Sequence, residues 1–106
     1  MADDPMWALV MFDAPVKSAE QRASATRFRN TLLDYGFSMV QYSVYAKYLP
    51  TGVTGVPTLR AIRNRVPYQA KVRILFVSDR QWANMQRFYG EIQEFHAEKP
   101  QQLMFF

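Results

Sequence analysis

A continuous apolar run near the start of the chain constrains the fold more than any other feature. Residues Met6–Phe12 read MWALVMF without one charged or strongly polar side chain, and Asp13 and Pro15 close the run. The run is far shorter than the roughly 20 apolar residues that a membrane-spanning helix requires. Its length fits a strand, and the absence of alternation is typical of a central strand covered on both faces. The fold is therefore expected to contain a sheet built around this segment.

A helix is predicted to follow this strand. Ser18 and Gln21 have the spacing of a capping box, in which each side chain satisfies a free amide of the first turn. Apolar side chains then recur at helical spacing, at Ala25, Phe28, Leu32 and Tyr35. Gly36 suits the left-handed conformation that commonly ends a helix. We therefore expect a helix from Ser18 to about Gly36.

The next segment, Phe37–Leu49, is rich in β-branched and aromatic residues but is longer than most strands. We expect two strands joined by a kink near Gln41 and Tyr42. The pattern alone also permits one long bent strand. Residues 51–55 read as a loop, and a second helix is expected from Pro57 to Pro67, with Arg60, Arg63 and Arg65 on it.

The remaining segments complete the predicted order. Ala70–Ser78 alternates at first and is then apolar, which predicts a strand. Asp79–Arg87 is expected to form a short helix capped by Asp79 and anchored by Trp82 and Met85. The last four residues, Leu103, Met104, Phe105 and Phe106, predict a short terminal strand.

This order predicts an α+β fold. Strand, helix, strand, strand, helix, strand is the βαββαβ pattern of the ferredoxin-like sandwich, whose antiparallel sheet carries both helices on one face. We expect one domain over residues 1–106, with a core of about residues 6–90 and an additional C-terminal strand at about residues 102–106. The other face of the sheet needs a cover, and 49% hydrophobic residues is rich for 106 residues. A homodimer is therefore expected.

The charge of the chain is concentrated in its middle. The whole chain carries +4, but residues 22–73 contain nine Lys and Arg against one acid, a balance of +8. Such a segment indicates a polyanionic partner, and guanidinium groups bind phosphates without reading bases. The candidate nucleic-acid-binding residues are Arg22, Arg29, Arg60, Arg63, Arg65, Lys71 and Arg73. The alternative interpretation is an ordinary solvated helix face.

Asp13 is the candidate catalytic and metal-binding acid. It ends an apolar strand and precedes Pro15, so its carboxylate is expected at the end of the sheet, where a hard cation can bind. One Mg²⁺ ion held by Asp13 of both subunits would polarise a phosphodiester and generate hydroxide. The alternative is that Asp13 merely caps the strand end or the following turn.

Several other kinds of site are excluded or disfavoured. The absence of cysteine excludes disulfides and thiolate chemistry, and His96 is the one histidine, which disfavours zinc. Neither a nucleophilic triad nor a glycine-rich phosphate loop is present. Tyr42, Tyr45 and Tyr48 either stack on bases or, as is commoner in strands, pack in a core or interface. A secretory signal is not apparent, so we expect a cytoplasmic protein without membrane association.

Four blocks of the sequence together resemble the CRISPR-associated protein two family. They are Leu9–Pro15, LVMFDAP; Arg27–Phe37, RFRNTLLDYGF; Gln41–Tyr45, QYSVY; and Val72–Gln81, VRILFVSDRQ. They occur in order and at similar spacing, and the likeness covers about residues 6–90 and the terminal strand. Four linked blocks are far more specific than any single motif.

The resemblance implies a ferredoxin-like homodimer that sits between two dimers of the CRISPR integrase. There it helps to position duplex DNA for insertion into the repeat array during spacer acquisition. Members are also described as Mg²⁺-dependent endoribonucleases or deoxyribonucleases, so single-stranded RNA is a second candidate substrate. The family's metal-binding acid matches Asp13, and its terminal strand, which pairs with the partner subunit's sheet, matches residues 103–106.

A function of another class remains as the alternative. Many functions share the ferredoxin-like topology, and an RNA-binding or small-molecule-binding regulatory module is one of them. RNA recognition on a sheet face uses a strand motif that combines glycine with aromatic residues. The strand over residues 72–78 contains no glycine, which disfavours this alternative.

Overall fold

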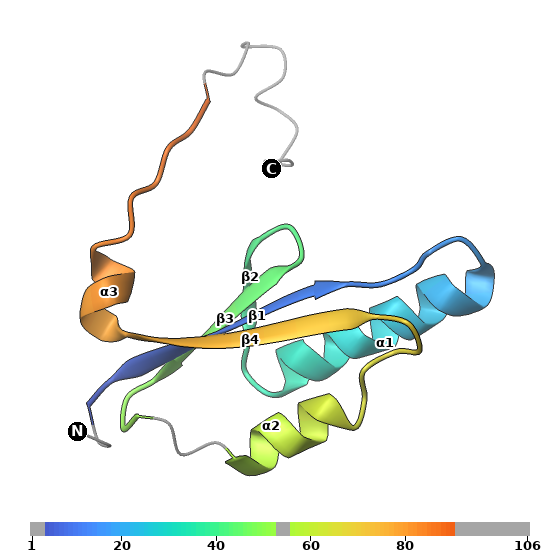
Figure 1. Ribbon diagram of the computed structural model, residues 1–106, viewed down its shortest axis with the longest axis horizontal. Helices are drawn as coiled ribbons and strands as arrows, with labels where there is room; N and C mark the ends of the chain where they lie inside the picture. Colours follow the sequence, from blue (N-terminus) through green and yellow to red (C-terminus); the bar gives the residue numbers. More distant parts are fainter. Residues whose placement is uncertain (1–3, 53–55, 91–106) are drawn as a thin grey trace.

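The computed structural model describes residues 4–52 and 56–90. In this part of the chain, four strands form one antiparallel sheet in the order β2-β3-β1-β4. They are β1, Met6–Asp13; β2, Ser38–Gln41; β3, Val44–Leu49; and β4, Lys71–Ser78. Figure 1 shows α1, Ala19–Asp34, and α2, Val56–Arg63, on the same side of this sheet. The α+β class predicted from the sequence is therefore confirmed, as is the order of the elements up to β4.

Strand β1, Met6–Asp13, lies between β3 and β4, as its apolar sequence predicts. Ala8, Val10 and Phe12 point to one face of the strand and are buried. Leu9 and Met11 point to the other face and are only half-buried. The expectation that both faces are covered is thus only partly met within a single chain, because the two longer helices pack on the same face.

Helix α1, Ala19–Asp34, begins and ends as its sequence predicts. The Ser18 hydroxyl accepts a hydrogen bond from the Gln21 amide at 3.0 Å, and the Gln21 side chain accepts one from the Ser18 amide, also at 3.0 Å. After the helix, Gly36 has a φ of 91°, which glycine adopts without steric cost. Phe28 and Leu32 are fully buried against the sheet.

Strands β2, Ser38–Gln41, and β3, Val44–Leu49, form a hairpin with a two-residue turn. The sequence predicts a kink here, because neither Tyr42 nor Ser43 is a usual hairpin-turn residue. In the structure, Ser43 adopts a φ of 63°, the conformation that glycine or asparagine normally supplies. A shift of register between Met39 and Gln41 marks a β-bulge in β2.

Helix α2, Val56–Arg63, is shorter than predicted. Asn64 and Arg65 form a turn after it, so Arg65 does not belong to the helix as expected. The residue before a proline disfavours helical backbone, and here the helix ends before Pro67 is reached. Ile62 is completely buried and packs with Val10 and Leu32.

Strand β4, Lys71–Ser78, is followed directly by α3, Asp79–Ala83. The helix is shorter than the predicted Asp79–Arg87, and its N-cap is Ser78 rather than Asp79. The Ser78 hydroxyl accepts from the Gln81 amide at 3.0 Å. Asp79 instead accepts a hydrogen bond from the Trp7 indole nitrogen at 2.8 Å, which ties α3 to β1.

Aromatic stacking strengthens the contact between α3 and β1. The rings of Trp7 and Trp82 are nearly parallel, at 11°, with centroids 4.2 Å apart. The ring of Tyr48, on β3, meets Trp7 at 5.2 Å. The guanidinium of Arg87 lies 5.8 Å from the centre of the Trp82 ring, within cation–π range. The short helix is thus held on the face of the sheet opposite α1 and α2.

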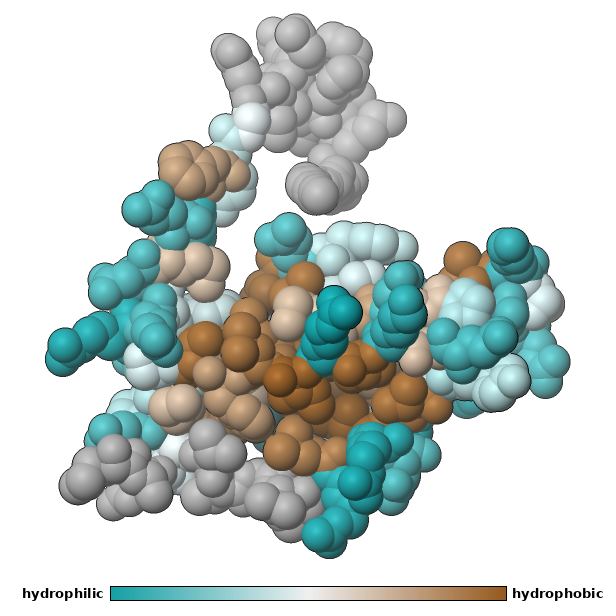
Figure 2. All heavy atoms as spheres, viewed as in Figure 1, coloured by the Kyte–Doolittle hydropathy of each residue, from teal (hydrophilic) through white to brown (hydrophobic). Residues whose placement is uncertain are grey.

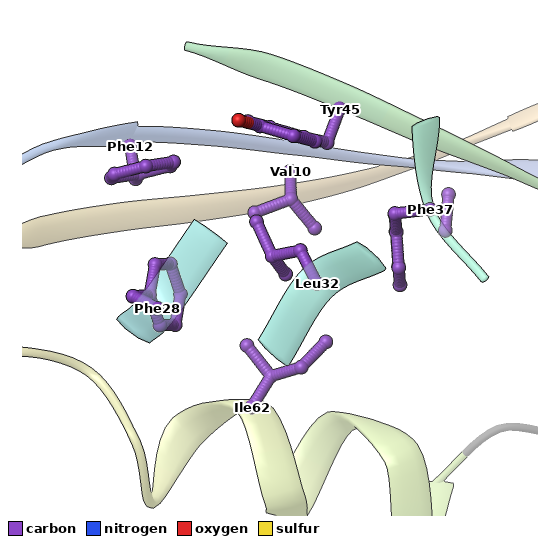
Figure 3. Packing of buried hydrophobic residues seen from close by; sticks show 8 residues of the cluster. Val10, Phe12, Phe28, Leu32, Phe37, Tyr45 and Ile62 are labelled. Atoms are coloured by element: carbon purple, nitrogen blue, oxygen red, sulfur yellow. The ribbon is translucent and has the colours of Figure 1, made fainter. Parts of the chain in front are cut away.

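The core of the described chain lies between the sheet and the two long helices. Figure 3 shows Phe12 above Phe28, and Ile62 pointing from α2 toward Leu32 and Val10. The rings of Phe12 and Phe28 meet edge to face, with centroids 5.0 Å apart. The opposite face of the sheet keeps apolar surface in contact with solvent, and Leu75 on β4 is 51% exposed. Apolar surface is extensive around the centre of the molecule in Figure 2.

The predicted terminal strand, Leu103–Phe106, lies outside the described residues, as does His96. The additional strand and its role at a dimer interface therefore stay predictions.

Core packing predicts a large difference between two neighbouring leucines of α1. Leu32 is 0% exposed and Leu33 is 51% exposed. Leu32→Ala should lower the free energy of unfolding by about 3 kcal/mol, because the cavity adds to the lost transfer free energy. Leu33→Ala, the matched control, should change it by less than about 0.5 kcal/mol. Denaturant unfolding of both variants measures this, and equal losses would contradict the packing described.

Candidate functional site

A shallow hollow lies at the end of β1, where the strand leaves the sheet toward α1. It has a volume of about 230 Å³ and is lined by Asp13, Ala14, Pro15, Gln69 and Lys71. Figure 1 shows that the end of β1 and the start of β4 lie at the same end of the sheet. Two segments more than 50 residues apart in the sequence therefore form one site.

The pairing of β1 with β4 places Asp13 directly opposite Lys71. Residues opposite each other in an antiparallel pair have Cβ atoms about 4.5–5.5 Å apart on the same face. Both side chains are exposed. Within the described residues, the Asp13 carboxylate makes no hydrogen bond or ion pair, so the structure does not use it as a cap for the strand end or turn.

Two of the predicted nucleic-acid-binding residues lie on α1. The Arg22 guanidinium donates to the backbone carbonyls of Val16 and Lys17, at 3.1 and 3.2 Å. Arg29 is half-buried and donates to the Thr26 hydroxyl at 3.4 Å. These partners are neutral, so no hydrogen-bonded carboxylate offsets the charge of either arginine in the described part of the chain.

The other five cations lie on or after α2 and on β4. Arg60, Arg63 and Arg65 are exposed, and Arg65 donates to the Ala61 carbonyl at 3.2 Å. On β4, Val72 and Ile74 pack against the core, so the alternating Lys71 and Arg73 point to the opposite face. The seven cations therefore lie on both sides of the sheet of one chain and do not form a single patch.

The three tyrosines of β3 and its turn have different environments. Tyr45 is buried in the core, 5.9 Å from the Phe12 ring, as the commoner interpretation of a strand tyrosine predicts. Tyr48 packs on Trp7, and Tyr42 is 76% exposed in the turn. Burial raises the pKa of Tyr45 above its usual 10.0, while the nearby Arg29 guanidinium acts in the opposite direction and Tyr42 adds to the increase.

Carboxylates are sparse around the hollow. Among the described residues, no group of three or more His, Cys, Asp and Glu side chains lies close enough to hold a metal ion. One exposed carboxylate per chain still fits Mg²⁺, which keeps several of its waters and uses one or two carboxylates.

No helix in the described part of the chain is long and apolar enough to cross a bilayer.

Gln69 is the polar residue of this site that the sequence analysis does not identify. It occupies the third position of a turn in which the Ala70 amide donates to the Pro67 carbonyl at 3.0 Å. Its φ is 67°, a conformation for which such turns normally use glycine or asparagine. Glutamine has no preference for this backbone conformation, so no sequence pattern predicts the turn. The structure alone shows that Gln69 lines the hollow.

Comparison with known proteins establishes the family. A family model described as CRISPR associated protein Cas2 matches residues 6–85. The chain belongs to the Cas2 family. This confirms the resemblance that the four sequence blocks indicated. The first block lies on β1 and the residues after it, and the second lies on α1 and the turn that follows. The third spans the turn between β2 and β3, and the fourth lies on β4 and α3.

Curated relatives support the membership over nearly the whole chain. A protein from Paracidovorax avenae, named CRISPR-associated endoribonuclease Cas2, is 39% identical over 102 residues, which cover 95% of this chain and 94% of the relative. A protein of the same name from Flavobacterium psychrophilum is 36% identical over 97 residues, 92% of this chain and 84% of the relative.

A solved structure agrees with this assignment at the level of the fold. It is described as the crystal structure of cas2 and superimposes with a TM-score of 0.60, covering 96% of this chain and all of that chain. Its sequence is 16% identical, so the comparison concerns the backbone arrangement alone.

The burial of Tyr45 predicts a pH dependence of stability. A phenol whose pKa is higher in the folded state stabilises the fold below pH 10.0, and this contribution is lost as pH rises through the folded-state pKa. Tyr45→Phe should therefore reduce the fall in unfolding free energy between about pH 9 and pH 11. Tyr68→Phe is the control, at a residue that is 87% exposed. An unchanged profile for Tyr45→Phe would contradict the prediction.

Proposed function

We propose that this Cas2-family protein acts in CRISPR spacer acquisition by binding the backbone of duplex DNA as a homodimer between integrase dimers. The observation that carries this proposal is the set of seven cations on α1, α2, β4 and the turn after α2. Six of them are exposed, and none forms an ion pair with a carboxylate in the described part of the chain. Cations that remain uncompensated are available to phosphates.

The distribution of these cations favours contacts with an extended ligand. They lie on both sides of the sheet, and a duplex presents phosphates on two strands along its length. A two-fold assembly doubles every contact. Phosphate contacts of this kind fix position and carry no base information, which suits a protein that handles DNA of many sequences.

The face of the sheet opposite α1 and α2, where α3 packs on Trp7 but other apolar side chains stay exposed, supports the proposed homodimer. Leu75 and Tyr48 on this face are 51% and 43% exposed, and Leu9 and Met11 on the intervening strand β1 point to the same face. Packing against a second copy would cover this apolar surface. The strand order and the βαββαβ order of the elements support a ferredoxin-like fold, and Leu103–Phe106 is the proposed additional interface strand.

Charge reversal tests the proposed DNA contacts. The triple variant Arg60→Glu, Arg63→Glu and Arg73→Glu should weaken binding to duplexes of all sequences alike. The slope of log affinity against log salt should fall by up to about 2.7 per subunit, since each phosphate contact contributes about 0.9. Fluorescence anisotropy over a salt series measures both quantities.

The control for this experiment is Arg80→Glu, which reverses an exposed cation of α3 outside the proposed set. A wild-type affinity that is insensitive to salt, or strongly selective for one sequence, would count against the proposal.

A second function, Mg²⁺-dependent cleavage of a phosphodiester in single-stranded RNA, is favoured by the name of the curated relatives and by the free carboxylate of Asp13. We propose that Asp13 of both subunits holds one Mg²⁺, which when bound neutralises phosphate charge and supplies a hydroxide near neutral pH. In the overall reaction water adds to phosphorus and the bond to the leaving oxygen breaks. The leaving oxygen takes up a proton.

Removal of this carboxylate tests the second function. Asp13→Ala should reduce Mg²⁺-dependent RNA cleavage to background, while far-ultraviolet circular dichroism and the dimer mass stay unchanged, because Asp13 makes no bond that supports the fold. Asp34→Ala removes another exposed carboxylate, at the end of α1, and should cleave normally. Undiminished cleavage by Asp13→Ala would indicate a contaminating nuclease or another site.

A further inference from the structure

The hollow beside Asp13 contains one side chain that the proposed function treats only as one of seven phosphate contacts, Lys71, and one that it does not use, Gln69. Lys71 is exposed, lies directly opposite Asp13 and forms no ion pair with it, although both residues are described. Gln69 lines the same hollow from the turn before β4. An ammonium group and a carboxamide can both donate to an anionic oxygen. The hollow thus combines one acceptor-only group with two groups able to donate.

The backbone of Gln69 supports a role beyond the turn itself. In a turn closed by the hydrogen bond from Ala70 to Pro67, glycine would fit a φ of 67° without steric cost. The chain instead carries a long amide side chain there. Residues held in sparsely populated backbone conformations are enriched at functional sites, where the surrounding structure maintains the strain.

We infer that this hollow binds one phosphate of a nucleic-acid backbone, with the Lys71 ammonium and the Gln69 amide as its donors, beside the Asp13 carboxylate. The inference rests on the proposed function and assigns the substrate contacts of that same site. Lys71 then acts as a positioning residue for the phosphodiester next to Asp13. Within the set of seven cations, Lys71 is the one that lies directly opposite Asp13, and the sheet separates it from the arginines of α2.

The electrostatics of the pair distinguish this role from a simple structural one. An ammonium opposite Asp13 disfavours a divalent cation on that carboxylate, because like charges repel. Loss of Lys71 should therefore weaken the binding of nucleic acid without weakening the binding of Mg²⁺. A lysine that only paired with Asp13 would affect nucleic-acid affinity no more than any other exposed cation of the chain.

The experiment uses the full chain in an Asp13→Asn background, so that the RNA is not cut during the measurement. The probe is a short fluorescent oligouridylate in Mg²⁺ buffer, with anisotropy as the readout. Lys71→Ala should raise Kd by about tenfold, the usual effect of losing a charge-assisted hydrogen bond. It should also lower the salt slope by about 0.7, the contribution of one contact to a single strand.

Arg80→Ala is the matched control, because it also removes one exposed cation, from the opposite end of the sheet. It should raise Kd by less than about threefold, as an effect of net charge alone. Equal effects of Lys71→Ala and Arg80→Ala would overturn the inference and leave the proposed function intact. If the Asp13→Asn protein binds neither the RNA nor duplex DNA, the proposed function fails and the inference fails with it.

Gln69→Gly provides an independent arm, since glycine relieves the backbone conformation. The melting temperature should rise, which excludes misfolding as a cause of any lost affinity, while Kd for the oligouridylate should rise about threefold or more through loss of a neutral hydrogen bond. A higher melting temperature with unchanged Kd would show that Gln69 serves the turn alone and would remove it from the site.

Calorimetric titration of Mg²⁺ into wild type and Lys71→Ala completes the test, and weaker Mg²⁺ binding by the variant would contradict the role assigned to Lys71.

Discussion

The packing of α1 and α2 on one face of a four-stranded sheet is the constraint on which the rest of the structure depends. Val10, Leu32 and Ile62 come from a strand and two helices, and each is fully buried where these elements meet. Close packing of this kind fixes the position of each element to within the fit of its side chains. It also leaves the second face of the sheet with half-buried apolar residues, which is the physical basis of the proposed homodimer.

The same packing fixes the register of β1 against β4, and this register creates the candidate site. A slip of one residue would move the side chains of β4 to the other face. Val72 and Ile74 would lose the core, so the register that buries them also sets Lys71 opposite Asp13. The site is thus positioned by apolar contacts several residues away, and its polar groups need not hold one another in place.

Much of this fold can be predicted from the sequence, because the local sequence signals agree with the way the elements pack. The apolar run of β1, the capping box at Ser18 and the glycine after α1 each act within a few residues, and the structure contains all three features. The errors arose where tertiary structure overrides local preference. Ser43 and Gln69 adopt left-handed backbone without being typical turn residues, and Asp79 bonds to Trp7 across the sheet while Ser78 caps α3.

Only the part of the candidate site that depends on local signals could be predicted from the sequence. The position of Asp13 at the end of an apolar strand is a local signal, and the accumulation of Arg and Lys is visible in composition. Which cations accompany Asp13 depends on the pairing of strands that are distant in sequence. The sequence grouped Lys71 with the arginines of α2, whereas the antiparallel pairing of β1 and β4 places it beside the carboxylate.

The stacking of Trp7 on Trp82 has a practical consequence. These are the two tryptophans of the whole chain, and they share one contact between β1 and α3. Indole emission depends strongly on the immediate surroundings of the ring, so the intrinsic fluorescence of this protein reports on a single junction and not on an average over the molecule. Any displacement of α3 during assembly would therefore be visible in the native, unlabelled chain.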